Sequence, residues 1–455
     1  MQKRIITILI TAAALIIQSC SILQGTKKTT TTQQETAKAD SVWTHYTQEV
    51  RPATEVKFEI PTDSLTGAGY TYELPESMNA NIDSLLNSWQ TRHILKSPES
   101  STTTRPAAAI TDTMYAKRLA SMYTIVRMPY NNIVRSYIDR YVNKNRSQVA
   151  YMLGAAELYM PIIEEEIDRI GVPHELKYLP IIESALNPKA TSRMGAKGLW
   201  QFIFTTGKLY GLKTNNYIDE RFDPVKSTTA ALLYLKDLYE MFQNWELAIA
   251  AYNCGPGNVK KAIKRSGGKT DFWEIYPWLP RETRGYLPGF IAANYVMTFY
   301  EDHGIHPMEP DIPFVTDTVH VNRNLHFKQI VEVCGTDIEE IRALNPQFLK
   351  EVIPGENETF VLRLTNSSIT KFVENEDSIY NHEREKYFPN SDVAKMLQEA
   401  KQNNGAGNLI RHKIKSGETL GSIALKHRVS VKQIMKWNNM QNSKIRAGKY
   451  LNIYK

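Results

Sequence analysis

The chain has 455 residues, of which 42% are apolar and 23% are charged, a composition typical of globular proteins that excludes a wholly disordered or fibrous chain. At roughly 150 residues per domain, this length predicts about three folded units. Lysine and arginine total 55 against 48 acidic residues, and the net charge of +7 is compatible with nucleic acid, an anionic membrane or another acidic partner. The three cysteines, Cys20, Cys254 and Cys334, are too few for a disulfide framework, and the last two are expected to be free thiols.

The N-terminus has the pattern of an export signal. Lys3 and Arg4 precede an almost uncharged run, Ile5–Ile17, whose helix would rise only about 20 Å, short of the roughly 30 Å hydrocarbon core of a membrane. The run ends in Ile-Gln-Ser-Cys, which resembles a lipobox. Residues 1–20 are therefore predicted to be a lipoprotein signal peptide with lipidation at Cys20. The alternative is a plain secretory signal with an incidental cysteine.

The middle of the chain predicts a helical domain behind a spacer. Residues 21–50 are poor in apolar side chains, and the whole segment 21–112 is predicted to be a flexible spacer. Between residues 113 and 306, apolar residues recur at three- and four-residue spacing, which predicts an all-helical domain with its own core. The predicted helices are Met114–Met128, Ile133–Val142, Val149–Ile170, Glu175–Leu186, Thr228–Phe242, Trp245–Tyr252 and Tyr286–Tyr300.

The chain after Pro307 predicts two small α+β modules. Residues 315–365 have the order strand, helix, helix, strand, residues 366–408 are a polar linker with room for one helix, and residues 409–455 repeat the first order. The segments are strands at Thr318–Val321 and Phe360–Leu364 around helices at Phe327–Val333 and Ile338–Leu344, then strands at His412–Lys415 and Tyr450–Ile453 around helices at Leu420–His427 and Val431–Trp437. The predicted fold class is multidomain, with a mainly α domain followed by small βααβ modules.

Glu183 is the first candidate for chemistry. Leu176, Leu179, Glu183 and Leu186 share one helix face, so the carboxyl group lies in an apolar stripe, one turn after Pro180, which should kink the helix. Burial disfavours the charged form and raises the pKa of a carboxyl group, which suits a general acid near neutral pH. The alternative is a glutamate at a helix end that points to solvent.

Four blocks of sequence extend this hypothesis. They resemble, in kept order over about 190 residues, the family 1 lytic transglycosylases, whose catalytic domain has a goose-type lysozyme-like fold. The Trp of the second block and the Glu-Thr-Arg-x-Tyr pattern of the fourth are typical of a membrane-bound branch of that family. The blocks are Glu183-Ser184-Ala185-Leu186-Asn187-Pro188, Gly195-Ala196-Lys197-Gly198-Leu199-Trp200-Gln201, Ala251-Tyr252-Asn253-Cys254-Gly255-Pro256-Gly257 and Glu282-Thr283-Arg284-Gly285-Tyr286.

The resemblance implies a role for six residues. Glu183 matches the single catalytic acid/base, and the positions that match substrate contacts are Ser184, Gln201, Tyr252, Asn253 and Tyr286. The glycines have reasons of their own: Gly195 and Gly198 are expected to let the backbone approach a sugar ring, and Gly255-Pro256-Gly257 is expected to end the helix that carries Tyr252.

The reaction implied is non-hydrolytic cleavage of the β-1,4 bond between N-acetylmuramic acid and N-acetylglucosamine, which leaves 1,6-anhydromuramyl ends. Most glycosidases need two carboxylates, so a hydrolytic muramidase that uses Asp219, Glu220 or Asp223 is one alternative. These three are expected at a loop and helix start instead, with Asp223-Pro224 as a cap. A non-catalytic scaffold that only grips peptidoglycan is a second alternative. No cofactor or metal is implied.

The last 45 residues resemble a LysM module, from His412-Lys413-Ile414-Lys415-Ser416-Gly417-Glu418-Thr419-Leu420 to the final strand. By position, the resemblance assigns binding of N-acetylglucosamine-containing glycans to Gly417, Thr419, Leu420, Asn438 and Ile445. The alternative is a module that only packs on its neighbour. Residues 315–365 share the outline without the Ser-Gly-Glu-Thr opening, so they are predicted to be a degenerate LysM-like module.

The basic charge belongs to the tail. Residues 411–455 contain eleven Lys and Arg against one acidic residue, a charge of +10, whereas the remainder, with 44 basic and 47 acidic residues, carries −3. An anionic wall polymer is the expected partner of such a tail, and no nucleic-acid motif accompanies the charge. The expected partners are peptidoglycan glycan strands and a membrane reached through the anchor at Cys20. The expected location is the outer membrane, facing the periplasm.

Overall fold

The computed structural model describes residues 72–79, 85, 95, 110–309, 315–356 and 358–389, and most of 409–454. The predicted signal peptide, Cys20 and the first part of the predicted spacer lie outside the described residues. None of the helices within these ranges has the length and apolar character needed to cross a bilayer.

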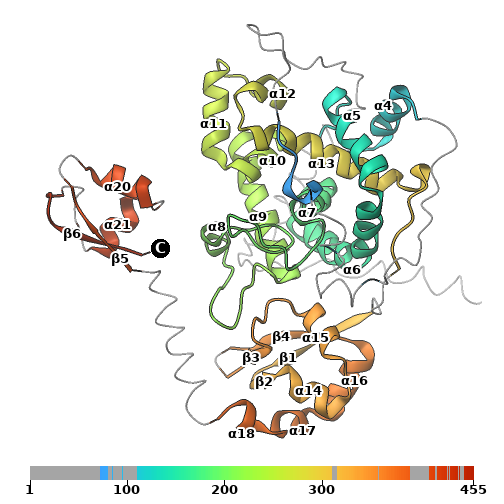
Figure 1. Cartoon of the computed structure of the whole chain (residues 1–455), viewed down its shortest axis with the longest axis vertical. Helices are drawn as coiled ribbons and strands as arrows, with labels where there is room; N and C mark the ends of the chain where they lie inside the picture. Colours follow the sequence, from blue (N-terminus) through green and yellow to red (C-terminus); the bar gives the residue numbers. More distant parts are fainter. Residues whose placement is uncertain are drawn as a thin grey trace, which may run out of the picture. The chain divides into compact units, whose positions relative to one another are not determined.

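Residues 110–309 form the all-helical domain that the apolar spacing predicts (Figure 1). The first predicted helix is shorter than expected and ends at Ser121. Three α-helices and two 3-10 helices of this domain were not predicted, because four of the five are very short and the fifth, α11, buries only Val259 and Ala262. The elements are α4 (Asp112–Ser121), α5 (Asn132–Asp139), η2 (Arg140–Lys144), α6 (Arg146–Ile170), η3 (His174–Tyr178), α7 (Leu179–Ser184), α8 (Phe204–Leu209), α9 (Pro224–Phe242), α10 (Trp245–Cys254), α11 (Pro256–Arg265), α12 (Phe272–Ile275), η4 (Tyr276–Trp278), α13 (Arg281–Phe299) and η5 (Glu301–His303).

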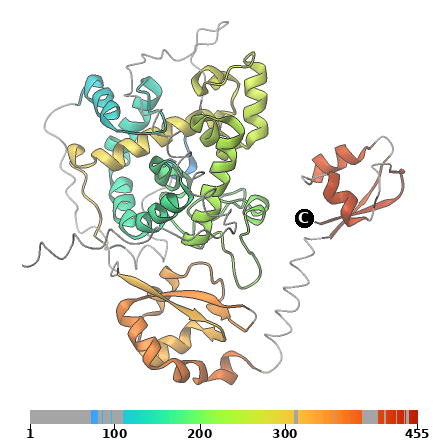
Figure 2. The ribbon, with the colours of Figure 1, turned by 180° about the vertical axis from the view of Figure 1, so that it is seen from behind.

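Helix α7 lies in the middle of this domain, in contact with α13 and η3 (Figure 1, Figure 2). Pro180 lies where the 3-10 helix η3 passes into α7, so its effect is a change of helix type. The helix ends at Ser184, since Ala185 and Leu186 both adopt left-handed backbone conformations, with φ of 52° and 59°. A non-glycine residue in this conformation costs on the order of 1–3 kcal/mol. Such strained backbone persists where the surrounding packing fixes it, and it is often found at functional sites.

The loop after α7 folds back against α9. Trp200 is fully buried, and its indole N–H donates to Oγ1 of Thr228 at 2.8 Å. Gly198 has a φ of 82°, and a Cβ there would lie 1.8 Å from the carbonyl oxygen of Arg221. The expectation that Gly198 makes room for a sugar is therefore wrong, because the glycine is required by a backbone approach inside the protein.

Residues 315–389 form the predicted LysM-like module with one extension. Strands β1 and β4 pair antiparallel, a second pair, β2 and β3, was not predicted, and the two expected helices are present. The chain expected to be linker from residue 366 instead continues in three helices, whose Phe372, Ile379 and Tyr380 join the module's core. The elements are β1 (Thr316–Val321), β2 (Asn324–His326), α14 (Phe327–Cys334), α15 (Ile338–Leu344), β3 (Val352–Pro354), β4 (Phe360–Thr365), α16 (Asn366–Glu374), α17 (Glu376–Asn381) and α18 (Arg384–Tyr387).

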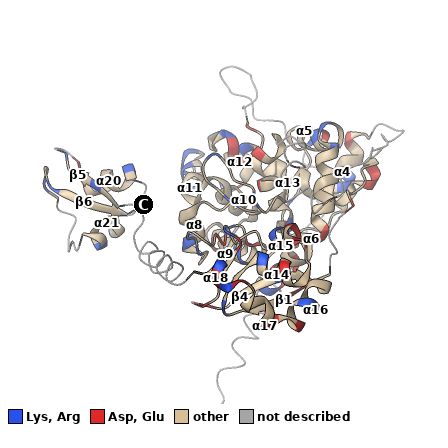
Figure 3. Cartoon of the chain, turned by 60° about the horizontal axis from the view of Figure 1, so that its bottom comes forward, with Lys and Arg blue, Asp and Glu red and all other residues tan. Residues whose placement is uncertain are grey.

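The tail module has the predicted strand, helix, helix, strand order. Its antiparallel strands are β5 (Leu409–Lys413) and β6 (Tyr450–Tyr454), and its helices are α20 (Leu420–His427) and α21 (Val431–Trp437). Ile414, Ile423, Ile434 and other apolar side chains form its own core. Basic residues outnumber acidic ones in its described part, where Glu418 is the single acidic residue (Figure 3).

Candidate active site

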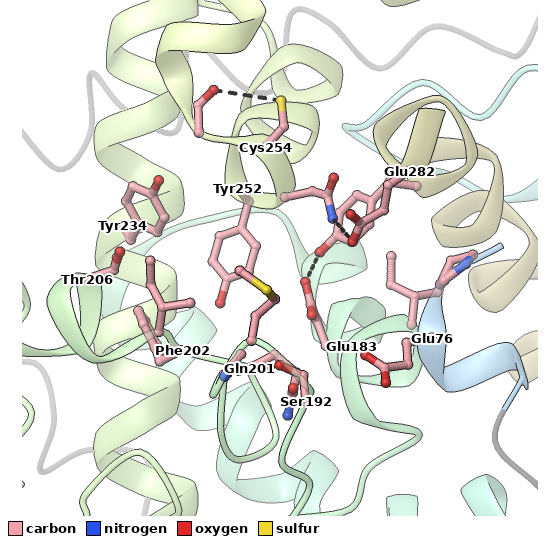
Figure 4. A pocket seen from close by; sticks show the side chains of 18 residues that line it. Glu76, Glu183, Ser192, Gln201, Phe202, Thr206, Tyr234, Tyr252, Cys254 and Glu282 are labelled. Atoms are coloured by element: carbon pink, nitrogen blue, oxygen red, sulfur yellow. Dashed lines mark hydrogen bonds between the residues drawn. The ribbon is translucent and has the colours of Figure 1, made fainter. Parts of the chain in front are cut away.

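A cleft of about 430 Å³ opens in the helical domain beside the C-terminal end of α7. It collects residues from α7, the following loop, α10 and α13, which are far apart in the sequence (Figure 4). Five of the six site residues predicted in this domain line the cleft: Glu183, Gln201, Tyr252, Asn253 and Tyr286.

Glu183 is half-buried at the end of α7, and its environment favours the protonated form. Burial raises the pKa of Glu183 to about 8, and the negative charge of Glu282 acts in the same direction. The hydroxyl of Tyr286 donates a hydrogen bond to Oε1 of Glu183, which lowers this pKa in part. Glu183 therefore carries its proton at neutral pH in a cleft open to ligand, as a general acid requires.

Helix α10 presents Tyr252 and Asn253 to the cleft and ends directly after them. Gly255, with a φ of 81°, terminates α10 by donating its N–H to the carbonyl of Ala251, which confirms the predicted stop. The hydroxyl of Tyr252 donates to the carbonyl of Trp200 at 2.8 Å, and burial raises the pKa of Tyr252 well above its usual value. Tyr252 is thus a neutral, fixed wall of the cleft.

The start of α13 holds the side chain of Asn253 from both ends. Oγ1 of Thr283 donates to Oδ1 of Asn253 at 2.8 Å, and Nδ2 of Asn253 donates to Oε1 of Glu282 at 3.4 Å. Figure 4 shows Glu282, which accepts the bond from Asn253, above Glu183. These two bonds fix the orientation of the Asn253 amide before any ligand binds.

Gln201 and Ser184 are held differently. Nε2 of Gln201 donates to the carbonyls of Gly198 and Ala190 at 2.8 and 3.3 Å, which leaves its amide oxygen as an acceptor for a ligand. Ser184 is buried and does not line the cleft; its hydroxyl bonds to the carbonyls of Leu199 and Pro180. The role expected for Ser184 as a substrate contact is thus not supported, because the side chain ties α7 to the next loop.

Several residues that line the cleft were not predicted from the sequence. Ser192, Met194 and Tyr234 line the wall opposite α13, and Glu282 was read only as part of a sequence block. Glu76, from a segment assigned to the spacer, also lines the cleft. Tyr234 lies in a helix that was predicted, but neither helical periodicity nor a sequence block indicates which residues face Glu183, because the tertiary fold brings them together.

The three carboxylates considered for hydrolysis lie outside this cleft. Asp219 is fully buried and bonded to the guanidinium of Arg221 and the amine of Lys197, and Glu220 is paired with Lys226. Asp223 accepts hydrogen bonds from the first backbone N–H groups of α9, at 3.0 Å each, which confirms the predicted cap. All three have structural partners.

The tail module uses several of its predicted glycan contacts internally. Leu420 is 2% exposed within the core, and Ile445 packs against the same core, so the contact expected at Leu420 is wrong. Both ends of the Asn438 amide bond to β6, through the backbone N–H and C=O of Asn452 at 2.7 and 2.8 Å, which also argues against the expected role. Thr419 is exposed at the start of α20, where it bonds to Ser422, and Gly417 lies outside the described residues.

One cluster in the described part of the chain has the composition of a metal site, but it lies in the LysM-like module. It consists of Glu332, His382 and Glu383. Nε2 of His382 bonds to Oε2 of Glu332 at 2.8 Å, and Glu383 pairs with Lys386. These partially exposed groups satisfy one another and contribute nothing to the cleft. Cys254 and Cys334 are free thiols, as predicted.

Comparison with known proteins places these domains in a family. Residues 160–275 match the transglycosylase SLT domain, residues 315–381 match the LysM-like domain of lytic transglycosylase MltD, and residues 412–453 match the LysM domain. Over 330 residues the chain is 32% identical to membrane-bound lytic murein transglycosylase D of Escherichia coli K12, covering 72% of this chain and 70% of that protein. It is also 35% identical over 120 residues to the soluble lytic murein transglycosylase of the same organism, covering 25% of this chain and 18% of that protein. The chain therefore belongs to the family of membrane-bound lytic murein transglycosylase D.

Proposed function

We propose that this chain is a peptidoglycan lytic transglycosylase in which Glu183 is the single acid and base. The observation that carries the proposal is the position of Glu183, which lines the cleft beside Tyr252 and Asn253 and accepts a hydrogen bond from Tyr286. Burial raises the pKa of Glu183 to about 8, which is suited to a proton donor at neutral pH. In the first step, Glu183 donates its proton to the oxygen that bridges N-acetylmuramic acid and N-acetylglucosamine, and the bond to the muramyl C1 breaks. The acetamido group of the muramyl residue stabilises the cationic centre in place of an enzyme nucleophile.

In the second step, Glu183 accepts the proton of the muramyl C6 hydroxyl, whose oxygen attacks C1 and closes the 1,6-anhydro ring. The proton count balances, because Glu183 ends protonated and no water is consumed. The Tyr286 hydroxyl, which bonds to Glu183, stabilises the carboxylate that exists between the two steps. Asn253 and Gln201 offer fixed polar groups for hydroxyl and acetamido groups of the sugars.

Two experiments test this function against its alternatives. Digestion of purified sacculi followed by mass analysis of the muropeptides should yield anhydromuramyl ends, and a majority of reducing ends would instead indicate hydrolysis. The Glu183→Gln variant should lose at least about a hundredfold in rate, the usual contribution of a general acid. A variant that digests sacculi as fast as the parent would remove Glu183 from the mechanism and leave a scaffold role open.

The tail module supplies wall binding in this proposal. Its charge of +10 is suited to a polymer that bears carboxylates, and such attraction between exposed charges weakens as salt rises. Retention of the full chain on sacculi should therefore decrease between low and high salt. Replacement of Lys413 and Lys415 on one side of the module by Gln should reduce that dependence. A retention unaffected by salt would contradict a charge-based contribution.

We propose that the chain is associated with a membrane and faces the periplasm. The similarity to a membrane-bound lytic murein transglycosylase supports the membrane association, and the lipobox-like sequence supports Cys20 as the anchor. A diacylated cysteine is enough for stable anchoring, whereas a single acyl chain binds reversibly. Cys20→Ser should move the chain from the outer-membrane fraction to a soluble fraction and abolish incorporation of labelled fatty acid. Labelling that persists in this variant would place the lipid elsewhere.

A further inference from the structure

Residues 72–79, here called the strap, precede the helical domain in the sequence and pack against it. Their contacts are with residues far along the chain. The backbone N–H of Glu73 donates to the carbonyl of Arg281 at 3.1 Å, and the hydroxyls of Tyr72 and Ser136 bond at 3.0 Å. Met78 is 1% exposed and belongs to the core. A segment with a buried anchor and directed hydrogen bonds is part of the domain, unlike the flexible spacer expected here.

Helix α6 and the residue before it, Asn145, hold the other end of the strap. Nε2 of Gln148 donates to the carbonyl of Ser77 at 2.5 Å, and Nδ2 of Asn145 donates to the carbonyl of Met78 at 2.9 Å. Both acceptors are backbone groups of buried residues, so each bond satisfies a carbonyl that would otherwise be costly to bury. The strap is therefore fixed at both ends.

Two glycines of helix α13 provide independent evidence that the strap packs against this helix. Gly285 and Gly289 lie inside the helix, where glycine is unfavourable by roughly 1 kcal/mol relative to alanine. A Cβ at Gly285 would lie 2.2 Å from the hydroxyl oxygen of Tyr137 and 2.3 Å from the carbonyl oxygen of Glu73, and one at Gly289 would lie 3.3 Å from Cγ of Pro75. Two glycines one turn apart thus leave the space that the strap and the Tyr137 side chain occupy.

The strap is bonded to the residue that precedes Glu183. The hydroxyl of Ser77 donates to the carbonyl of Ile182, the residue before Glu183, at 2.5 Å. Pro75 and Glu76 line the cleft, and Figure 4 shows Glu183 between Tyr252 and Glu76. The strap thus forms the wall of the cleft on the side away from Phe202 and Thr206.

We propose that Glu76 is a specificity-determining residue that accepts hydrogen bonds from a hydroxyl or acetamido N–H of a glycan bound in the cleft. Its side chain is exposed and has no hydrogen-bond or ion-pair partner among the described residues, although the backbone around it is anchored on both sides. A carboxylate on a fixed backbone is a strong acceptor for the donors that N-acetylated sugars carry. This inference rests on the proposed function.

The test uses the full-length chain and soluble, uncrosslinked peptidoglycan strands. Glu76→Ala should raise KM about tenfold, the value of one hydrogen bond to a charged group, and leave kcat within about twofold. Glu76→Gln keeps one acceptor oxygen and should recover part of the loss. Glu73→Gln changes an exposed carboxylate of the same strap outside the cleft and should leave KM unchanged.

An unchanged KM in Glu76→Ala, an equal rise in Glu73→Gln, or a fall in kcat at constant KM would each overturn the inference. Thermal unfolding of every variant identifies a loss of fold, and in that case the nearly isosteric Glu76→Gln decides alone. Glu183→Gln in the same assay separates the two proposals. Activity in that variant would refute the proposed function, whereas an inactive Glu183→Gln beside an unchanged Glu76→Ala would refute only the role of Glu76.

Discussion

The hydroxyl of Tyr286 donates a hydrogen bond to the carboxylate of Glu183, across 103 positions of sequence. The bond stabilises the ionised form of Glu183, whereas burial and the charge of Glu282 favour the protonated form. The balance leaves the pKa of Glu183 at about 8, so the group can donate a proton at neutral pH and take one back in the next step. Burial and the Glu183 charge raise the pKa of Tyr286 well above its usual range, which keeps its hydroxyl a donor throughout.

Replacement of Tyr286 by Phe should shift the alkaline limb of the pH–rate profile to higher pH. The variant loses the bond that favours the carboxylate, so the pKa of Glu183 rises, by about one unit for a bond to a charged group. Activity that needs protonated Glu183 should then persist to higher pH, although the maximal rate falls because the intermediate carboxylate is less stable. Rates of muropeptide release between pH 5 and 10 measure both effects. A limb that moves to lower pH would contradict this account.

Glu282→Gln should shift the same limb in the opposite direction. The variant removes the negative charge that raises the pKa of Glu183 and keeps an amide oxygen to accept from Asn253. The pKa of Glu183 therefore falls, and activity is lost at a lower pH than in the parent. Glu240→Gln, at an exposed position on α9, serves as a charge-matched control that should leave the profile in place. Equal profiles for Glu282→Gln and the parent would exclude this electrostatic effect.

The sequence predicts the parts of this site that depend on local pattern. Spacing alone placed Glu183 in an apolar stripe, and its half-buried position on α7 agrees with that reading. The sequence blocks then identified Gln201, Tyr252, Asn253 and Tyr286, all four of which line the cleft.

The remaining features depend on contacts between distant segments. Ser184 follows Glu183 directly, yet its hydroxyl donates to the carbonyl of Leu199, a partner that helical periodicity could not identify. The strap with Glu76 has a composition like that of the spacer around it, so only the buried Met78 and the glycines of α13 reveal its place. In the tail, the position of Asn438 was predicted, but its bonds to β6 follow from strand pairing.

Glu183→Gln should make the folded chain more stable at alkaline pH. In the folded state Glu183 holds its proton up to about pH 8, whereas an unfolded glutamate loses it near pH 4.3. The folded state therefore binds more protons between these values, and its stability falls as pH rises through this window. The neutral amide avoids the loss, so the variant should gain on the order of 4 kcal/mol at pH 8, seen as a higher Tm, and almost nothing at pH 4. Thermal unfolding at both values tests this, and a gain that does not depend on pH would point to another cause.

Alanine at Gly198 should be far more disruptive than alanine at Gly195. Both glycines have left-handed backbone conformations, with φ of 82° and 77°, so either substitution costs about 1–2 kcal/mol in backbone strain. At Gly195 nothing lies within 4 Å of the new Cβ, whereas at Gly198 the carbonyl oxygen of Arg221 lies at 1.8 Å. That carbonyl has little freedom, because the guanidinium of Arg221 is bonded to buried Asp219.

The difference between the two variants should therefore isolate the cost of the backbone approach. Gly198→Ala must displace the loop, and the amide of Gln201, which donates to the Gly198 carbonyl, moves with it. We expect a loss of several kcal/mol in the free energy of unfolding together with reduced activity for Gly198→Ala. Gly195 is not among the residues that line the cleft, contrary to its expected approach to a sugar ring, so Gly195→Ala should cost about 1–2 kcal/mol and keep near-parental activity. Urea unfolding and muropeptide release measure the two effects. Equal losses of stability in both variants would contradict this account. They would mean that the left-handed backbone conformation alone requires glycine at both positions, and that the loop can move away from the carbonyl of Arg221.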